Sequence, residues 1–167
     1  RIGSLEIVDL CEPLLERARE RARHLPNLRA SKGDAATWQP AQPVDCVYFS
    51  YSLTMIPAWR AALRNAIGML KPGGVLGVVD FHVSAKNPSS GFVRHNALTR
   101  WFWPRWFQHD GVQLGAERVA TLCDLLPDHE LTEGRGSVPY LPFLRVPYFR
   151  FVGRKARVNP DTEVIRR

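Results

Sequence analysis

The chain has 167 residues, of which 45% are apolar and 23% are charged. This composition fits one globular domain, and it excludes intrinsic disorder, collagen-like repeats and tandem modules. The formal net charge is +7, and residues 135–167 hold eight basic and only two acidic side chains. Such an excess favours an anionic partner, either nucleic acid or a membrane surface, unless it serves only solubility.

Targeting and covalent features are sparse. No run reaches the roughly 18 apolar residues of a membrane-spanning helix, and the opening RIGSLEIVDL has no signal-peptide organisation. The three cysteines are too few and too scattered for a zinc site or a disulfide framework, and we expect no metal. We expect a cytoplasmic protein, soluble or peripheral on a membrane, whose sequence here begins part-way into a larger chain.

The first half alternates short apolar runs with helical periodicity, which is typical of a parallel α/β sheet. The predicted strands are Leu5–Leu10, Leu28–Ala30, Val44–Ser50 and Val75–Phe81, and the predicted helices are Leu14–Leu25 and Trp59–Leu70. The second helix leaves through Lys71-Pro72-Gly73-Gly74, whose residue types suit a helix exit.

The second half changes character. Residues 92–110 form an aromatic and basic insertion, in which Pro104 is expected to kink or end any helix. A helix is predicted over Ala116–Leu126, and two strands over His129–Glu133 and Pro147–Gly153, which we expect to pair antiparallel. Residues 154–167 are predicted to be a basic polar tail.

Acidic residues follow three of the predicted strands. Ligands of open parallel sheets bind beyond the carboxyl ends of the strands, and Asp9, Asp34 and Asp80 lie at or just after such ends. A carboxylate at Asp9 can accept hydrogen bonds from the ribose hydroxyls of a nucleoside cofactor, and Asp34 can accept one from an adenine amine. Each acid alone could equally be a helix cap or a loop residue.

The order of these motifs resembles a known superfamily. VDLCEP, GDA, SYSLTMIP, LKPGG and VLGVVDF follow one another as in class I S-adenosylmethionine-dependent methyltransferases, and the likeness extends over about residues 1–153. It implies a Rossmann-like, mostly parallel sheet with flanking helices. The superfamily's first strand and its Gly-rich loop would stand before Arg1, so we expect both to be missing here and the missing strand to be central in the sheet.

Within that superfamily the chain is most similar to the N-methyltransferase module of betaine-lipid synthases. The residues that carry this likeness are FSYSLTMIP, GVVDF, RHNALTRWFWPRWFQHDGV and VPYFRFVG. That module trimethylates the homoserine amine of a diacylglyceryl headgroup. The resemblance therefore implies S-adenosyl-L-methionine as cofactor, a lipid or small-molecule amine as substrate, and an aminocarboxypropyl transferase as fused or separate partner.

The resemblance also implies roles for particular residues. Those expected to bind the cofactor are Asp9, Leu10, Asp34, Ala35, Ser50 and Tyr51. Tyr51 and His82 are the expected catalytic residues. Tyr51 accepts a hydrogen bond from the amine and presents its ring to the growing positive charge, and His82 relays the proton, with His95 and His109 as alternatives for the relay. Those expected to bind substrate are Arg94, His95, Trp101, Trp106, Tyr140 and Tyr148. Core packing is the competing explanation for each aromatic residue.

The insertion is the most unusual segment. Arg94–Phe107 holds three of the five tryptophans, two phenylalanines and three arginines, and no acid. Aromatic rings interleaved with arginine are typical of a segment at a membrane interface, although a lid that buries its rings would look the same. Nucleic acid is a less favoured partner, because the aromatic residues are clustered and FSYSLT replaces an NPPY-type strand end. A transferase of another amine and a non-catalytic membrane-binding fragment remain alternatives.

Overall fold

The computed structural model describes residues 2–109, 111–138 and 141–157. The strands are β1 (Leu5–Asp9), β2 (Leu28–Lys32), β3 (Val44–Ser50), β4 (Leu70–Phe81), β5 (His129–Val138) and β6 (Leu141–Arg154). The helices are α1 (Glu12–Arg21), α2 (Trp59–Met69), α3 (Ala97–Gln108) and α4 (Glu117–Leu125), with a short 3-10 turn, η1 (Leu53–Met55).

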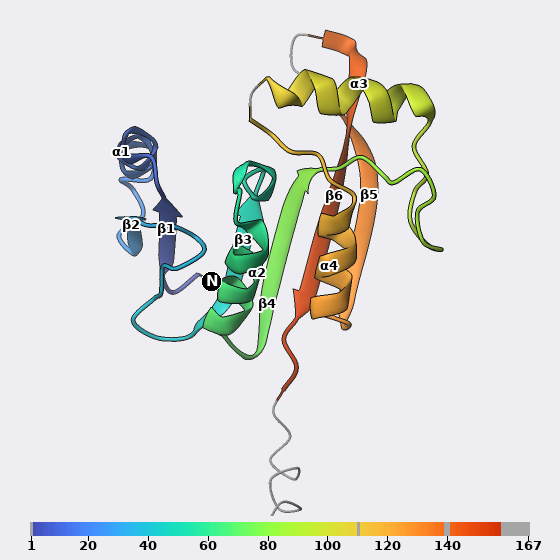
Figure 1. Cartoon of the computed structure of the whole chain (residues 1–167). Coiled ribbons are helices and arrows are strands. Elements are labelled where there is room, and N and C mark those ends of the chain that lie inside the picture. Colours follow the sequence, from blue (N-terminus) through green and yellow to red (C-terminus); the bar gives the residue numbers. More distant parts are fainter. Residues whose placement is uncertain (1, 110, 139–140, 158–167) are drawn as a thin grey trace, which may run out of the picture.

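The strands form two sheets. β1 pairs in parallel with β2, and the larger sheet has the order β3-β4-β6-β5. β3 is parallel to β4, whereas β6 is antiparallel to both β4 and β5. The predicted α/β architecture with an antiparallel C-terminal pair is therefore confirmed. Within the described residues no ladder joins β1 to β3, and in Figure 1 this division falls between those two strands, where the sequence predicts a further central strand.

The main core lies between the larger sheet and two helices. α2 and α4 lie on the same face of that sheet (Figure 1), and Leu63, Val78, Leu122 and Phe149 are among the side chains buried between them. Strand side chains alternate between faces, so Tyr48 and Val152 are on the opposite face, where they are 63% and 49% exposed.

Helix α3 lies across the end of the larger sheet at which β4 finishes (Figure 1). It begins where the Asn96 side chain accepts a hydrogen bond from the Thr99 amide at 2.8 Å, a regular N-terminal cap. Its buried Trp103 packs with Val83 and Val146 in a second, smaller core. The prediction that Pro104 ends a helix here is wrong, because α3 continues to Gln108 with Pro104 inside it. The packing of Trp103 outweighs the loss of one backbone hydrogen-bond donor at Pro104.

Several predicted boundaries also shift, among them the start of β4 and the end of β6. Strand β4 begins at Leu70, so Lys71-Pro72-Gly73-Gly74 belongs to the strand as well as to the helix exit. Arg154 belongs to β6, and the ammonium of Lys155 donates to the carbonyls of Ile67 and Leu70 at 2.9 and 2.7 Å. Unpaired carbonyls at a helix C-terminus favour such a cation, so Arg154 and Lys155 belong to the fold, and the tail predicted from residue 154 stays a prediction beyond them.

Candidate functional site

The two predicted cofactor acids lie at adjacent strand ends. Asp9 is the last residue of β1, and its register partner on the parallel strand β2 is Lys32, two residues before Asp34. One oxygen of the Asp9 carboxylate accepts from the Cys11 amide at 2.8 Å, and one oxygen of Asp34 accepts from the Ala36 amide, also at 2.8 Å. These bonds hold each carboxylate in a turn. Each carboxylate has further acceptor capacity.

The loop after β2 is fastened by a residue that sequence reasoning missed. Asn65 on α2 donates through its amide nitrogen to the carbonyls of Ala35 and Trp38, at 2.9 and 2.8 Å. One half-buried side chain thus spans two turns of the loop and holds Asp34 in position. A polar residue amid the apolar stripe of a predicted helix was the only signal in the sequence.

Tyr51 has the one strained backbone among the described non-glycine residues. Its φ is +50°, in the left-handed region, which costs a residue with a Cβ atom about 1–3 kcal/mol. The Tyr51 amide donates to the Val79 carbonyl at 2.8 Å, which fixes the turn out of β3 against β4. Its side chain is 43% exposed. Strain of this kind is frequent at functional sites, which supports the choice of Tyr51.

An aromatic cluster joins this turn to α3. The ring of Phe81, at the end of β4, lies 4.9 Å from that of Tyr51 and 4.8 Å from that of Phe107 on α3. Tyr148 on β6 is the register partner of Phe81, so both project from the same face of the sheet. The structure thus brings two predicted site residues, Tyr51 and Tyr148, next to the same phenylalanine. Phe81 and Phe107 were not predicted as site residues.

Asp80, the third strand-end acid, has a structural environment. It is fully buried, and its carboxylate accepts from the amide and hydroxyl of Thr54 at 3.0 and 2.7 Å and from the Phe81 amide at 2.8 Å. Burial raises the pKa of the Asp80 carboxyl, and these hydrogen bonds oppose the rise. Asp80 therefore binds η1 to the end of β4 instead of facing a ligand.

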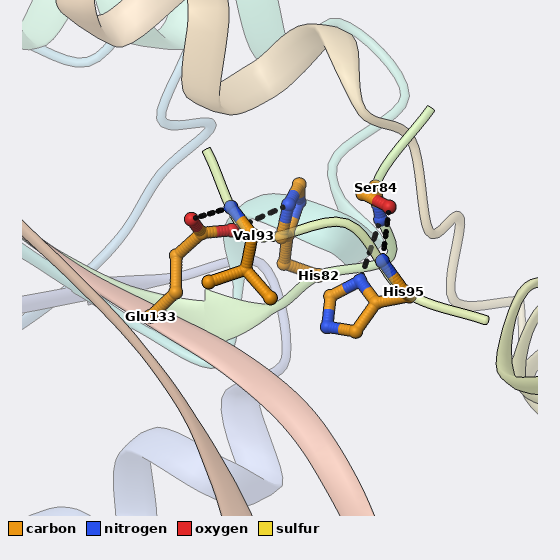
Figure 2. A network of polar contacts seen from close by, with 5 residues as sticks. All are labelled: His82, Ser84, Val93, His95 and Glu133. Carbon is orange, nitrogen blue, oxygen red and sulfur yellow. Dashed lines mark hydrogen bonds and ion pairs between the residues drawn. The ribbon is translucent and has the colours of Figure 1, made fainter. Parts of the chain in front are cut away.

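His82, one residue beyond β4, belongs to a buried polar network (Figure 2). Its Nε2 lies 3.1 Å from Glu133 Oε1, without the alignment of a regular hydrogen bond. The other carboxylate oxygen of Glu133 accepts from the Val93 amide at 2.7 Å. The imidazole is 4% exposed, and burial lowers its pKa from 6.5 to about 4. His82 is therefore neutral and weakly basic at pH 7.

His95 continues this network on the segment that leads to α3. Its Nδ1 accepts from the Ser84 amide at 3.0 Å, and its own amide donates to the Ser84 hydroxyl at 2.9 Å. Figure 2 shows this reciprocal pair beside His82. His95 is only 3% exposed, so it ties the segment before α3 to Ser84 and does not face solvent. The predicted substrate contact of His95 remains a prediction.

The aromatic residues of α3 divide into two sets. Trp101 and Trp106 are 57% and 49% exposed, whereas Trp103 is 4% exposed. The guanidinium of Arg105 lies over the Trp101 ring at 5.1 Å, and Arg94, before the helix, is exposed. The two tryptophans chosen from the sequence are thus the two on the surface.

The remaining predicted site residues are dispersed. Leu10 is 64% exposed, Ala35 packs against the main core, and Ser50 is the exposed last residue of β3. Tyr140 lies outside the described residues. Two hollows, of about 400 and 420 Å³, lie beside Glu133 and beside Arg118, and neither is lined by Asp9, Asp34 or Tyr51. In the described part of the chain no helix is both long and apolar enough to span a bilayer.

Comparisons with known proteins find sequence likeness over less than half of the chain. Residues 2–74 match the family described as "Methyltransferase domain". Trans-aconitate 2-methyltransferase of Agrobacterium fabrum is 38% identical over 71 residues, which cover 42% of this chain and 27% of that protein. Its namesake in Methylobacterium radiotolerans is 39% identical over 80 residues, which cover 47% and 30%. The chain thus spans less than a third of the length of these relatives.

Solved structures extend the likeness to nearly the whole chain. N-methyltransferase NodS from Bradyrhizobium japonicum superposes with a TM-score of 0.65 at 19% identity, over 92% of this chain and 74% of that one. Its complex with S-adenosyl-L-homocysteine superposes with a TM-score of 0.61 at 16% identity, over 91% and 66%. At these identities the likeness establishes the fold. Together the comparisons relate residues 2–74 to methyltransferases in sequence and the described chain to methyltransferases in fold.

Proposed function

We propose that the protein containing this chain transfers methyl groups from S-adenosyl-L-methionine to the amine of a membrane-lipid headgroup, and that the acceptor is the homoserine amine of a diacylglyceryl lipid. The observation that carries this proposal is the aromatic cluster of Tyr51, Phe81 and Phe107, which joins a strained strand end to α3. Aromatic faces favour quaternary ammonium groups, each contact by about 0.5–2 kcal/mol. The exposed tryptophans of α3 supply the membrane-facing surface.

The cofactor's place in this proposal follows from the donor set. S-adenosyl-L-methionine would supply an electrophilic methyl group. Asp9 would accept from its ribose hydroxyls and Asp34 from its adenine amine, since each carboxylate uses one oxygen for its own turn. The fit rests on two carboxylates at neighbouring parallel strand ends, with the loop after β2 held by Asn65 of α2. Leu10, Ala35 and Ser50 would complete this surface.

The chain's own residues would position the acceptor and exclude water, because in-line displacement needs alignment more than acid–base chemistry. The Tyr51 hydroxyl would accept a hydrogen bond from the amine, and the Phe81, Phe107 and Tyr148 rings would enclose the cation. The amine must lose a proton before it attacks. A His82 imidazole with a pKa of about 4 is a weak proton acceptor at pH 7. Its contribution would therefore be structural, through Glu133, which holds the segment before α3.

Association with the lipid surface would come from α3. Leu98, Trp101 and Trp106 are 68%, 57% and 49% exposed, and the helix also carries Arg100 and Arg105. Tryptophan rings prefer headgroup depth, and guanidinium groups bind lipid phosphates. This arrangement would bring the lipid amine to the strand ends that α3 covers.

A small-molecule carboxylate is the second candidate acceptor. It is favoured by the names of the two relatives at 38% and 39% identity, both trans-aconitate 2-methyltransferases. The two candidates differ in the atom that is methylated, nitrogen or carboxylate oxygen, so the products separate them.

The test is to express the full-length protein with the lipid precursor and to analyse total lipids by mass spectrometry. A trimethylated homoserine lipid that disappears in Tyr51→Ala and persists in the Tyr48→Ala control supports the proposal, since the exposed Tyr48 pairs with Gly77, four residues before Phe81 on β4. Methyl esters of small carboxylates without methylated lipid would establish the second candidate. Liposome association without any methyl transfer would indicate a membrane-binding role alone.

A further inference from the structure

The hollow beside the start of α4 contains a buried cation with unpaired donors. It measures about 420 Å³ and is lined by the end of α3, the following loop and the first turn of α4, including Gln108, Gln113, Glu117 and Arg118. The Gln113 amide donates to the Thr54 carbonyl at 2.9 Å, and Thr54 holds Asp80 at the end of β4. The wall of the hollow is thus attached to the strand end.

Arg118 is the unusual member of this wall. Its side chain is 2% exposed, and neither Nε nor Nη1 has a hydrogen-bond acceptor. Its guanidinium lies over the Trp59 ring at 5.0 Å. Within the described residues no carboxylate is within 4 Å of it, and Asp80 already accepts from three donors of its own.

Such an arrangement is unfavourable unless a ligand completes it. Buried guanidinium groups are normally paired and hydrogen-bonded, and burial lowers the pKa of Arg118 while the nearby charges of Glu117 and Asp80 raise it. Those two carboxylates stabilise the cation through space without supplying acceptors to Nε and Nη1. The planar guanidinium is the side chain best matched to carboxylate and phosphate oxygens.

The N-terminus of α4, which also borders the hollow, favours an anion as well. Helix α4 begins at Glu117 after Ala116, whose side chain cannot cap it. The first amides of a helix and its macrodipole favour an anion. Glu117 opposes this preference, because its exposed carboxylate also lines the hollow.

We propose that this hollow binds an oxyanion, a carboxylate or phosphate group, through Arg118. Oxyanion binding does not depend on the proposed function. The additional proposal that this oxyanion is part of the methyl acceptor rests on the proposed function. Carboxylate and phosphate sources share the chemistry and are separated by the choice of probe, citrate for the first and glycerol 3-phosphate for the second.

The test is a titration of the full-length protein with each probe, followed by the backbone amide resonances of residues 117–119 and by Trp59 fluorescence. Saturable shifts are expected with at least one probe. Arg118→Lys should weaken binding about threefold and Arg118→Met at least tenfold. The matched control is Arg60→Met, because the exposed Arg60 lies over the same Trp59 ring at 4.1 Å. The oxyanion affinity of this variant should stay within twofold of the wild-type value. Glu117→Gln should strengthen binding several-fold.

The proposal is overturned if no resonance of residues 117–119 shifts saturably in the wild-type protein, a result that needs no folded variant. It is also overturned if Arg60→Met weakens binding as much as Arg118→Met does, or if Glu117→Gln weakens it. Binding of S-adenosyl-L-homocysteine is measured on the same samples. If S-adenosyl-L-homocysteine binds and neither oxyanion does, this inference fails alone. If an oxyanion binds and S-adenosyl-L-homocysteine does not, the proposed function fails and the oxyanion site stands.

Discussion

Replacement of His82 by glutamine in the full-length protein is expected to remove a large part of the acid sensitivity of the fold. The imidazole is 4% exposed, and burial lowers its pKa from 6.5 to about 4. Above pH 6.5 it is neutral in both states, so it adds no pH dependence. As the pH falls from 6.5 to 4, the unfolded chain takes up a proton that the folded chain does not, and stability is lost.

The size of this loss follows from the shift. A pKa lowered from 6.5 to about 4 corresponds to about 3 kcal/mol below pH 4, and to about 2 kcal/mol between pH 7.5 and pH 5. The groups that face the imidazole are Glu133 and His95. Burial lowers the pKa of His95 as well, so His95 also lowers the stability of the fold as the pH falls. The Glu133 carboxylate would moderate this loss of stability by favouring protonated His82.

Urea denaturation at pH 7.5 and pH 5 measures the effect, and hydrogen exchange at the Ser84 and Val93 amides reports it locally, since the network holds both amides. His82→Gln should lose about 2 kcal/mol less than the wild type over this range. The control is His24→Gln, at an exposed position, which should follow the wild type. Equal losses in wild type and His82→Gln would refute the reasoning.

Three further predictions test other parts of the structure. Asp9→Asn should weaken binding of S-adenosyl-L-homocysteine at least tenfold in calorimetry, because a charged acceptor is removed, while Asp45→Asn, at an 85% exposed side chain, should not change it. Trp103→Ala should destabilise the fold by about 3–5 kcal/mol in urea denaturation, since its ring is buried. Trp101→Ala should change the stability by no more than about 0.5 kcal/mol but should reduce sedimentation with liposomes. An equal loss of stability in both variants would contradict the assignment of Trp103 to the core and Trp101 to the surface. Asn65→Ala should cost about 1–3 kcal/mol, because two carbonyls lose their donor, and it should lower cofactor affinity; the Arg64→Ala control at an exposed position should do neither.

Local pattern predicted the elements of the parallel half of the fold, although the helix predicted over Leu14–Leu25 runs from Glu12 to Arg21. The run over Val44–Ser50 was predicted with its observed bounds, and the helix over Trp59–Leu70 was one residue too long, because apolar periodicity alone determines both. The strand over His129–Glu133 was predicted too short, since its continuation to Val138 depends on pairing with the distant β6. Long-range pairing of that kind leaves no local pattern in the sequence.

The candidate site could be predicted only in part, for a similar reason. Strand ends identified Asp9 and Asp34, and parallel pairing put them at adjacent strand ends. Asp80 follows the same rule, yet Thr54 comes from a turn 26 residues away and buries it. Phe81 and Phe107 acquire their importance only when α3 lies across the sheet. Whether Trp101 or Trp103 faces the core depends on that same packing.

The most direct measurement is a structure of the full-length protein with S-adenosyl-L-homocysteine bound. The ribose hydroxyls should lie within hydrogen-bond distance of the Asp9 carboxylate, with the sulfur directed toward Tyr51. A complex in which the nucleoside occupies another surface, with Asp9 and Tyr51 both facing solvent, would contradict the account.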